Sequence, residues 1–452
     1  MDYSEKIASV MKKNSISVGQ KISIEKDGKM HEGMLMPNTG DPNCLVVKLD
    51  SGYNIGIAMD DNAKIRKIAF AKEKSEIKKQ NLKHDPSKPT IAILHTGGTI
   101  ASKIDYNTGA VKAIFDAEDL VEMVPELADI ANIRSRMIFQ MSSEDMNANH
   151  WEIIAKEVLE EINEGCDGII IGHGTDTMHY TSAALSFLLR DIPIPVILVG
   201  AQRSPDRGSS DAAINLICAA QFISDSDFAG IAICMHESSS DNFCYILPSC
   251  KTRKMHTSRR DAFRPINSKP IANIDYNLRK VEFIEKNYTK KDPKRMPKAD
   301  LKFSKKVALV KIYPGFRAEQ LDWYEKNCEG IVLEGTGLGH TPIAETDQYT
   351  KNNPEIEQKL KQMTEKGILV YMASQCIHGR VNMNVYTNAR KLLTVGVKPV
   401  YMLPEVAFIK LGWVLGHTKD PKEIDKLMQT NLAGEIISRS ELDDFPDKEL
   451  EK

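Results

Sequence analysis

The chain has 452 residues, of which 42% are hydrophobic and 27% are charged, and its formal net charge is −2. This apolar content supports packed cores and excludes a disordered or low-complexity protein, while the balanced charge excludes a globally basic nucleic-acid binder. At roughly 150 residues per domain, the length predicts about three domains.

The sequence contains neither a membrane span nor a secretory signal pattern. Its longest apolar runs, such as Gly168–Gly172 and Ile192–Ala201, are shorter than the roughly 20 residues that cross a bilayer. The start, Met1–Lys6, lacks the basic-then-apolar order of a signal peptide. The eight cysteines are scattered without a CxxC pair. We therefore expect a cytoplasmic protein whose cysteines are reduced and mostly buried.

Residues 1–85 predict a small all-β barrel followed by a basic linker. Lys21–Glu25 alternates polar and apolar residues, which is typical of a half-buried strand. Asp27-Gly28 then predicts a type I′ hairpin turn. Cys44–Leu49 and Tyr53–Ile57 continue the strands. The module shows no group of catalytic residues, so docking or spacing is the favoured role.

Between residues 88 and 278 the pattern changes to strands separated by helices. The expected strands are continuous apolar runs rather than alternating ones, which predicts a mainly parallel sheet covered on both faces. The predicted strands are 90–94, 133–139, 168–172, 195–200 and 230–234, and the predicted helices are 116–124, 151–162, 182–189 and 212–222.

A second α/β domain is predicted over residues 305–435, with strands at 307–312, 330–333 and 368–371. The connector 279–306 holds eleven Lys or Arg against four Asp or Glu, and Lys64–Lys88 holds nine against three. Two interpretations of these basic segments stay open. They are solvated connectors, which we favour, or contacts to tRNA phosphates.

Two of the predicted strands end in glycine turns that carry hydroxyl groups. The first strand runs into Thr96-Gly97-Gly98-Thr99, and the third into Gly172–Thr177. In open α/β sheets, ligands bind at the carboxyl ends of the strands. Two threonines there suit acyl transfer, in which one hydroxyl attacks a carbonyl and glycine amides stabilise the oxyanion. Taken singly, a Thr-Gly-Gly-Thr sequence is more often only a tight βα turn, and the second turn could likewise be a helix N-cap.

A threonine hydroxyl needs a group that removes its proton. Asp176 together with a lysine of the stretch Cys250–Ser258, which contains Lys254, is the candidate relay, because a partly desolvated lysine beside a carboxylate can act as a base. The alternative is that Lys254 is a solvated surface lysine beside Arg253, Arg259 and Arg260.

Together these motifs resemble the bacterial-type L-asparaginases and glutaminases. The resemblance covers residues 88 to 435 and implies two asparaginase-like α/β domains. Beyond the two turns, it rests on Ser143-Glu144-Asp145-Met146, Val199–Arg203, Lys254 ahead of Thr257, Asp261 and Phe263, and Pro404–Trp413.

The resemblance also implies roles for individual residues. Thr99 is the implied nucleophile, and Thr175, Asp176 and Lys254 form the activating relay, with the order of attack of the two threonines left open. Ser143 and Asp176, helped by Glu144, would hold the two charged ends of an amino acid, and Gly98 belongs to the substrate site. Many asparaginases carry glutamine in place of Glu144. The tyrosine of their flexible loop aligns here with either Ala110 or Tyr106.

The β module and the basic linkers resemble the D-subunit family of archaeal glutamyl-tRNA(Gln) amidotransferases, and Ser374–Met383 supports this more weakly. That family implies a glutaminase that supplies ammonia to a partner, the amidotransferase E subunit, which converts Glu-tRNA(Gln) with ATP and Mg. It also implies a homodimer within a heterotetramer. The sequence has no GxxxxGK[ST] loop, no GxGxxG fingerprint and no zinc-ligand cluster, so we expect no cofactor in this chain.

Two other hypotheses stay open. One is a stand-alone L-asparaginase with an accessory N-terminal domain. The other is a scaffold protein without activity, which the presence of Thr99, Thr175, Asp176 and Lys254 argues against.

Overall fold

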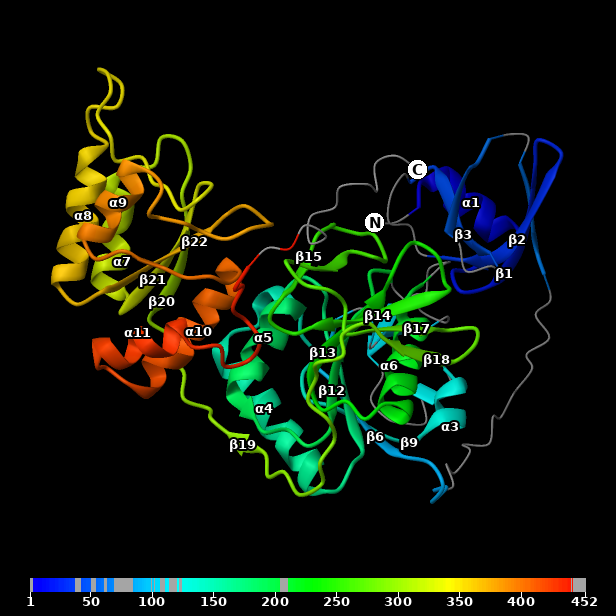
Figure 1. The fold of residues 1–452 in the computed structure, drawn as a ribbon. Coiled ribbons are helices and arrows are strands. Elements are labelled where there is room, and N and C mark those ends of the chain that lie inside the picture. Colours follow the sequence, from blue (N-terminus) through cyan, green and yellow to red (C-terminus); the bar gives the residue numbers. More distant parts are fainter. Residues whose placement is uncertain are drawn as a thin grey trace.

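A computed structural model describes residues 3–36, 42–49, 54–60, 63–68, 84–98, 100, 102–105, 110–113, 120–121, 124–203, 210–439 and 441. Figure 1 shows a small N-terminal domain, a large central α/β domain and a C-terminal α/β domain. No helix in the described ranges combines the length and apolar character needed to cross a membrane.

The N-terminal domain is a five-stranded antiparallel sheet with a helix packed on it. The predicted hairpin turn is confirmed, because Asp27 and Gly28 both have positive φ, at 51° and 73°. The helix was not predicted from the sequence, although its Ile7 is buried in the core of this domain. The strand order is β4-β3-β2-β1-β5, and no described pairing joins β4 to β5, so the described sheet is open. The elements are α1 (Glu5–Lys13), β1 (Lys21–Lys26), β2 (Lys29–Leu35), β3 (Cys44–Leu49), β4 (Asn54–Ala58) and β5 (Lys64–Lys67).

The central domain is built on an eight-stranded sheet of order β18-β17-β14-β13-β12-β10-β6-β9. The strands from β13 to β9 are parallel and the other three are antiparallel. The strands are β6 (Thr90–His95), β9 (Asn132–Met137), β10 (Gly168–Gly172), β12 (Pro195–Val199), β13 (Gly230–His236), β14 (Phe243–Pro248), β17 (Ala272–Asp275) and β18 (Lys280–Phe283).

Helices and short strands complete this domain. Of the predicted helix 116–124, only residues 120, 121 and 124 lie within the described residues. The helices are α3 (Glu126–Ile130), the 3₁₀ turn η2 (Ser143–Asp145), α4 (Ala148–Asn163), α5 (Met178–Leu188) and α6 (Ala212–Asp225). The short strands are β7 (Ser102–Asp105), β8 (Ala110–Ala113), β11 (Leu189–Arg190), β15 (Thr252–Lys254), β16 (Phe263–Pro265) and β19 (Lys298–Ala299).

The central parallel strands are apolar along their whole length because both faces of the sheet are buried. In β10, Ile169 and Ile171 pack into the hydrophobic cluster on the α4 and α5 side. Ile170 packs into the cluster on the α6 side. This explains why these strands do not alternate polar and apolar residues.

The C-terminal α/β domain carries a four-stranded parallel sheet of order β20-β21-β22-β23. Its apolar residues divide between a cluster of its own and the cluster on the α4 and α5 side of the central domain. Helix α10 contacts both α5 and this sheet (Figure 1). The elements are β20 (Val307–Lys311), η3 (Ala318–Leu321), α7 (Asp322–Asn327), β21 (Gly330–Gly335), α8 (Pro354–Glu365), β22 (Leu369–Ser374), α9 (Thr387–Thr394), β23 (Lys398–Pro399), α10 (Pro404–His417) and α11 (Pro421–Gln429).

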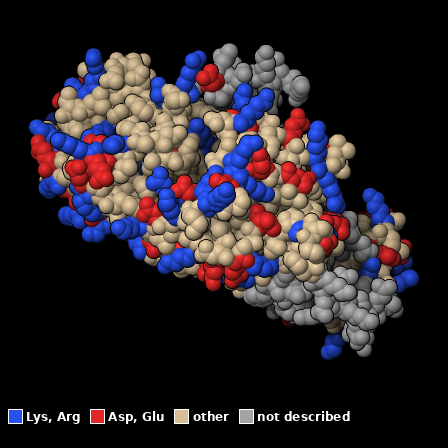
Figure 2. Space-filling view, turned by 60° about the horizontal axis from the view of Figure 1, so that its bottom comes forward, with Lys and Arg blue, Asp and Glu red and all other residues tan. Residues whose placement is uncertain are grey.

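The segment 279–306, predicted as a connector, also forms a strand and several side-chain contacts with the central domain. Its first residues form β18, which pairs with β17. Several of its basic side chains bind within the chain: Lys290 pairs with Asp227, Lys298 with Asp191, and Arg295 donates to the Ile192 carbonyl. On the face in Figure 2, basic and acidic side chains are interspersed. These contacts favour a structural role for the segment.

Candidate active site

The two glycine turns predicted from the sequence meet at the carboxyl ends of β6 and β10, which are neighbouring parallel strands. Thr96 donates to the Gly172 carbonyl through its backbone N–H, at 2.9 Å, and through its Oγ1, at 3.0 Å. Gly98 has φ of +76°, and a Cβ placed on it would lie 2.6 Å from the Gly174 Cα. Glycine adopts this conformation without strain, and only glycine, which has no Cβ, permits this close approach. The turns are therefore held against each other by their backbones.

Lys254 reaches this junction from β15, far along the chain. Its Nζ lies 2.9 Å from Thr175 Oγ1 and 2.6 Å from Asp176 Oδ1. The Lys254 side chain is 10% exposed, whereas that of Asp176 is 65% exposed. The structure therefore brings together a hydroxyl, a carboxylate and a shielded amine, and the carboxylate faces solvent, where a substrate can approach.

Ser143 lies on the other side of the Gly174 turn. Its side chain is buried, and a Cβ on Gly174 would lie 2.9 Å from Ser143 Oγ. Thr177 Oγ1 donates to the Ser143 carbonyl at 2.6 Å. Glu144 is exposed, and within the described residues no hydrogen bond or ion pair joins its side chain to Thr175, Asp176 or Lys254. Ser143 therefore contacts the candidate site directly, whereas Glu144 is only next to Ser143 in the sequence.

Two of the predicted positions cannot be placed. Thr99 and Tyr106 lie outside the described residues. The residues on either side of Thr99 are described. Gly98 abuts Gly174, and a Cβ on Gly172 would lie 3.4 Å from Ile100 Cγ2.

Two buried histidines, His95 and His173, lie next to the turns, and the sequence alone predicted no role for either. His173 Nδ1 donates to the Gly174 carbonyl at 2.6 Å, and its Nε2 lies 3.1 Å from Met146 Sδ. Burial lowers the pKa of His173 to about 4 and that of His95 to about 4. Both rings are therefore neutral at pH 7. His173 supports the Gly174 backbone, which a sequence motif alone does not show.

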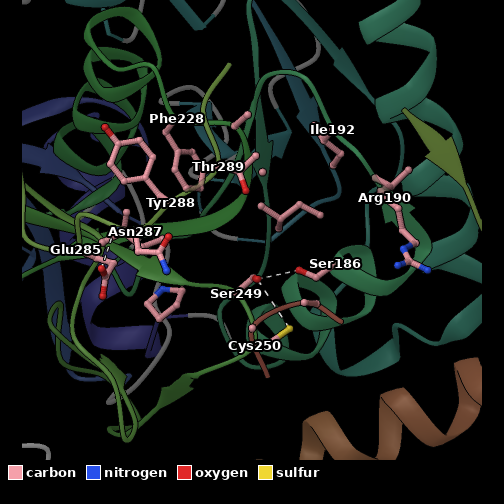
Figure 3. Close-up of a pocket in the computed structure, with 18 of the residues that line it drawn as sticks. Ser186, Arg190, Ile192, Phe228, Ser249, Cys250, Glu285, Asn287, Tyr288 and Thr289 are labelled. Carbon is pink, nitrogen blue, oxygen red and sulfur yellow. Dashed lines mark hydrogen bonds between the residues drawn. The ribbon is translucent and has the colours of Figure 1, made fainter. Parts of the chain in front are cut away.

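A cavity of about 550 Å³ lies elsewhere in the central domain. It is lined by the last turn of α5, the start of β13 and the end of β14. Ser186 Oγ donates to Ser249 Oγ there at 2.8 Å, a hydrogen bond that Figure 3 marks with a dashed line. Burial raises the pKa of the neighbouring Cys250 thiol to about 12, so this cysteine is not a nucleophile at neutral pH. None of Thr175, Asp176 and Lys254 lines this cavity, which is therefore separate from the candidate site.

Within the described residues, no group of three His, Cys, Asp or Glu side chains is arranged to hold a metal ion. All eight cysteines are free, and five of them are buried. The candidate site consists of amine, hydroxyl and carboxylate groups, which are the groups of acyl-transfer chemistry.

Known protein families match this chain over each of its three domains. Sequence profiles match over residues 90–288 ("Asparaginase, N-terminal"), 306–428 ("Glutaminase/Asparaginase C-terminal domain") and 16–68 ("GatD N-terminal domain"). The glutamyl-tRNA(Gln) amidotransferase D subunit of Pyrococcus furiosus is 49% identical over 440 residues, covering 95% of this chain and 97% of that protein. The chain belongs to the D-subunit family of glutamyl-tRNA(Gln) amidotransferases.

Other comparisons place this D-subunit family within the asparaginase fold. The D subunit of Pyrococcus horikoshii is 47% identical, covering 97% of this chain and 99% of that protein. The thermostable L-asparaginase from Thermococcus kodakarensis superposes with a TM-score of 0.67 at 32% identity, covering 77% of this chain and 99% of that one. L-asparaginase I from Vibrio cholerae gives a TM-score of 0.64 at 26% identity, with the same coverage.

Proposed function

We propose that this chain hydrolyses the side-chain amide of glutamine and supplies the ammonia to a tRNA-dependent amidotransferase. In the first step a threonine hydroxyl attacks the amide carbonyl, so that an ester forms and ammonia leaves. In the second step water attacks the ester, which releases glutamate and restores the hydroxyl. The site supplies the nucleophile, the proton relay and the oxyanion donors that these two steps require.

In this proposal Thr99 forms the ester. The Thr99 hydroxyl proton passes through Thr175 to Lys254, which acts as the base, and Asp176 stabilises the ammonium that results. The proton then returns to the leaving nitrogen as ammonia departs. Gly98 provides a backbone N–H near the reacting carbonyl. Substrate orientation needs donors for the α-carboxylate and a carboxylate for the α-amino group. Ser143 is assigned to the first, and Asp176, with Glu144, to the second.

One observation carries the proposal. Lys254 Nζ contacts both Thr175 Oγ1 and Asp176 Oδ1, at 2.9 and 2.6 Å, although 78 residues or more separate them along the chain. A solvated surface lysine, the alternative interpretation of Lys254, would not be 10% exposed between two such partners.

The partner in this proposal is the amidotransferase E subunit, which converts Glu-tRNA(Gln) to Gln-tRNA(Gln) with ATP and Mg bound to itself. The relatives are named as the D subunit of this amidotransferase. We infer a homodimer within a heterotetramer. Ammonia released into water at neutral pH is protonated and lost as a nucleophile, so the two proteins need a sealed contact.

The test compares glutamine and asparagine hydrolysis by the chain alone and with the E subunit and Glu-tRNA(Gln). Glutamine turnover that rises only in the complex supports the proposal. Thr99→Ala should abolish glutamine-dependent product, whereas added ammonium should restore it, because amide transfer occurs on the E subunit. Failure of that rescue with the complex intact would mean that the substitution damages more than the ammonia supply.

A second candidate is a stand-alone L-asparaginase with an accessory domain. It is favoured by the solved L-asparaginase from Thermococcus kodakarensis, which is 32% identical over 77% of this chain. Strong asparagine turnover without a partner would select this candidate.

A further inference from the structure

Strand β15 places two neighbouring cations on opposite faces. Its residues pair with β16 in antiparallel register, Arg253 opposite Arg264 and Lys254 opposite Phe263. Successive side chains of a strand point to opposite sides. Lys254 therefore points to Thr175 and Asp176, while Arg253 points away from them, toward the C-terminal domain.

The partner of Arg253 is a buried glutamate of that domain. Arg253 Nε lies 3.4 Å from Glu405 Oε1, and the Glu405 side chain is only 2% exposed. Glu405 lies in the first turn of α10, directly after Pro404. Within the described residues Glu405 Oε1 accepts no hydrogen bond. Burial raises the pKa of Glu405, and the Arg253 cation is the charged group that opposes this shift. A buried carboxylate whose cation is removed is strongly destabilised.

The other charged and titratable groups near Glu405 do not supply a second cation for it. Glu334 is the second buried carboxylate in this region, and its own cation is Lys311, at 3.4 Å. On α5, His179 is neutral, because burial, with Arg253 and Lys254 nearby, lowers its pKa to about 3. Burial raises the pKa of Tyr180 to about 12. Arg253 is thus the cation that faces Glu405.

We propose that Arg253 and Glu405 are positioning residues that hold Lys254 in place. This inference rests on the function proposed above and adds that the C-terminal domain, through α10, fixes the base of the central domain. Because Arg253 and Lys254 share one short strand, a shift of Arg253 along the strand displaces the Lys254 amine by a similar amount. Misplacement of a catalytic group by about 1 Å costs on the order of 100-fold in rate.

The experiment uses the full chain in complex with the E subunit. In Glu405→Gln we expect kcat for glutamine hydrolysis to fall by roughly 10- to 100-fold, with KM changed by less than about 3-fold, because substrate contacts remain while the base moves. Arg253→Met should give a similar loss. The double variant should lose little more than either single one, because both changes break the same pair. Glu325→Gln is the matched control, since Glu325 pairs instead with Lys359 and Lys366 beside α7 and α8.

A second measurement does not depend on activity. Hydrogen exchange of the Arg253 and Lys254 amides should be faster in Glu405→Gln than in the wild type and in Glu325→Gln. A normal kcat, full multiplication of the two single effects, or unchanged exchange at β15 would each overturn the proposal. A wild-type complex without glutaminase activity would overturn the proposed function instead, and the exchange measurement would still decide whether the pair holds β15.

Discussion

Lys254 links a hydroxyl and a carboxylate that are neighbours in sequence. With Nζ at 2.9 Å from Thr175 Oγ1 and 2.6 Å from Asp176 Oδ1, a proton can pass between these groups with little movement of heavier atoms. Removal of the amine would leave both acceptors in place but would remove the group that connects them.

We expect Lys254→Ala to lower glutamine turnover by at least about 100-fold, as is usual for loss of a general base. The measurement is steady-state ammonia release by the complex. Lys269→Ala is the control, because Lys269 is exposed and no ion pair involves it in the described part of the chain. Near-normal turnover in Lys254→Ala would contradict the role assigned to this amine.

The buried histidines make stability depend on pH. Burial lowers the pKa of His173 to about 4, whereas an unfolded chain protonates histidine near 6.5. Between these values the unfolded state binds the proton and the folded state does not, so stability falls as the pH falls.

The expected loss is about 2 kcal/mol for His173 between roughly pH 7.5 and pH 5. His173→Asn should therefore show a smaller drop in thermal midpoint over this pH range than the wild type. His84→Asn, at an exposed position, should follow the wild type. An equal pH dependence in all three proteins would show that His173 is not held neutral in the folded state.

At the level of elements, the junction of the turns after β6 and β10 depends on Gly98. Gly165 offers a comparison, because its φ of +80° is similar to that of Gly98 but a Cβ on it would meet nothing within 4 Å. The two glycines thus separate the effect of backbone conformation from the effect of close contact.

We expect Gly98→Ala and Gly165→Ala each to lose about 1 to 2 kcal/mol from left-handed strain. Only Gly98→Ala should also lose activity, by on the order of 100-fold, because the new methyl group forces the two turns apart. Thermal melts and ammonia release measure the two effects. Equal activities in the two variants would mean that the close approach of the turns is not needed.

The elements that could be predicted are those that a short stretch of sequence is enough to recognise. The strands β6, β10 and β12 were found as continuous apolar runs, and the hairpin turn as Asp27-Gly28. Helix α1 was missed, although its Ile7, Val10 and Met11 follow helical spacing. The antiparallel strands β14, β17 and β18 were not predicted. The pairing of β14 with β17 joins segments that are distant in sequence, whereas β17 and β18 form a hairpin of neighbouring strands that was missed.

The same distinction applies to the candidate site. Thr175 and Asp176 follow a strand that is evident from its sequence. Lys254 lies on a three-residue strand that pairs with β16, and it was found through the family resemblance. The sequence points to Glu405 only as one residue of the stretch Pro404–Trp413. Its contact with Arg253 joins two domains, and such a contact leaves no local sequence pattern.

At the scale of the whole molecule, the N-terminal domain has a core of its own, formed by residues between Ile7 and Ile65. We expect deletion of residues 1–83 to leave the thermal midpoint of the two α/β domains nearly unchanged and to weaken binding of the E subunit. Calorimetry and a binding assay measure these effects. Unfolding of the remaining chain would show that the small domain supports the larger ones.

The two α/β domains, in contrast, share one hydrophobic cluster. Leu94 and Ile171 of the central sheet belong to the same cluster as Val332 and Val406 of the C-terminal domain. The boundary that the sequence profiles place between residues 288 and 306 therefore does not separate two independent bodies. Recombination at this boundary between distant relatives would join mismatched halves of a single interior, so the two halves are expected to have been inherited together and to have coevolved.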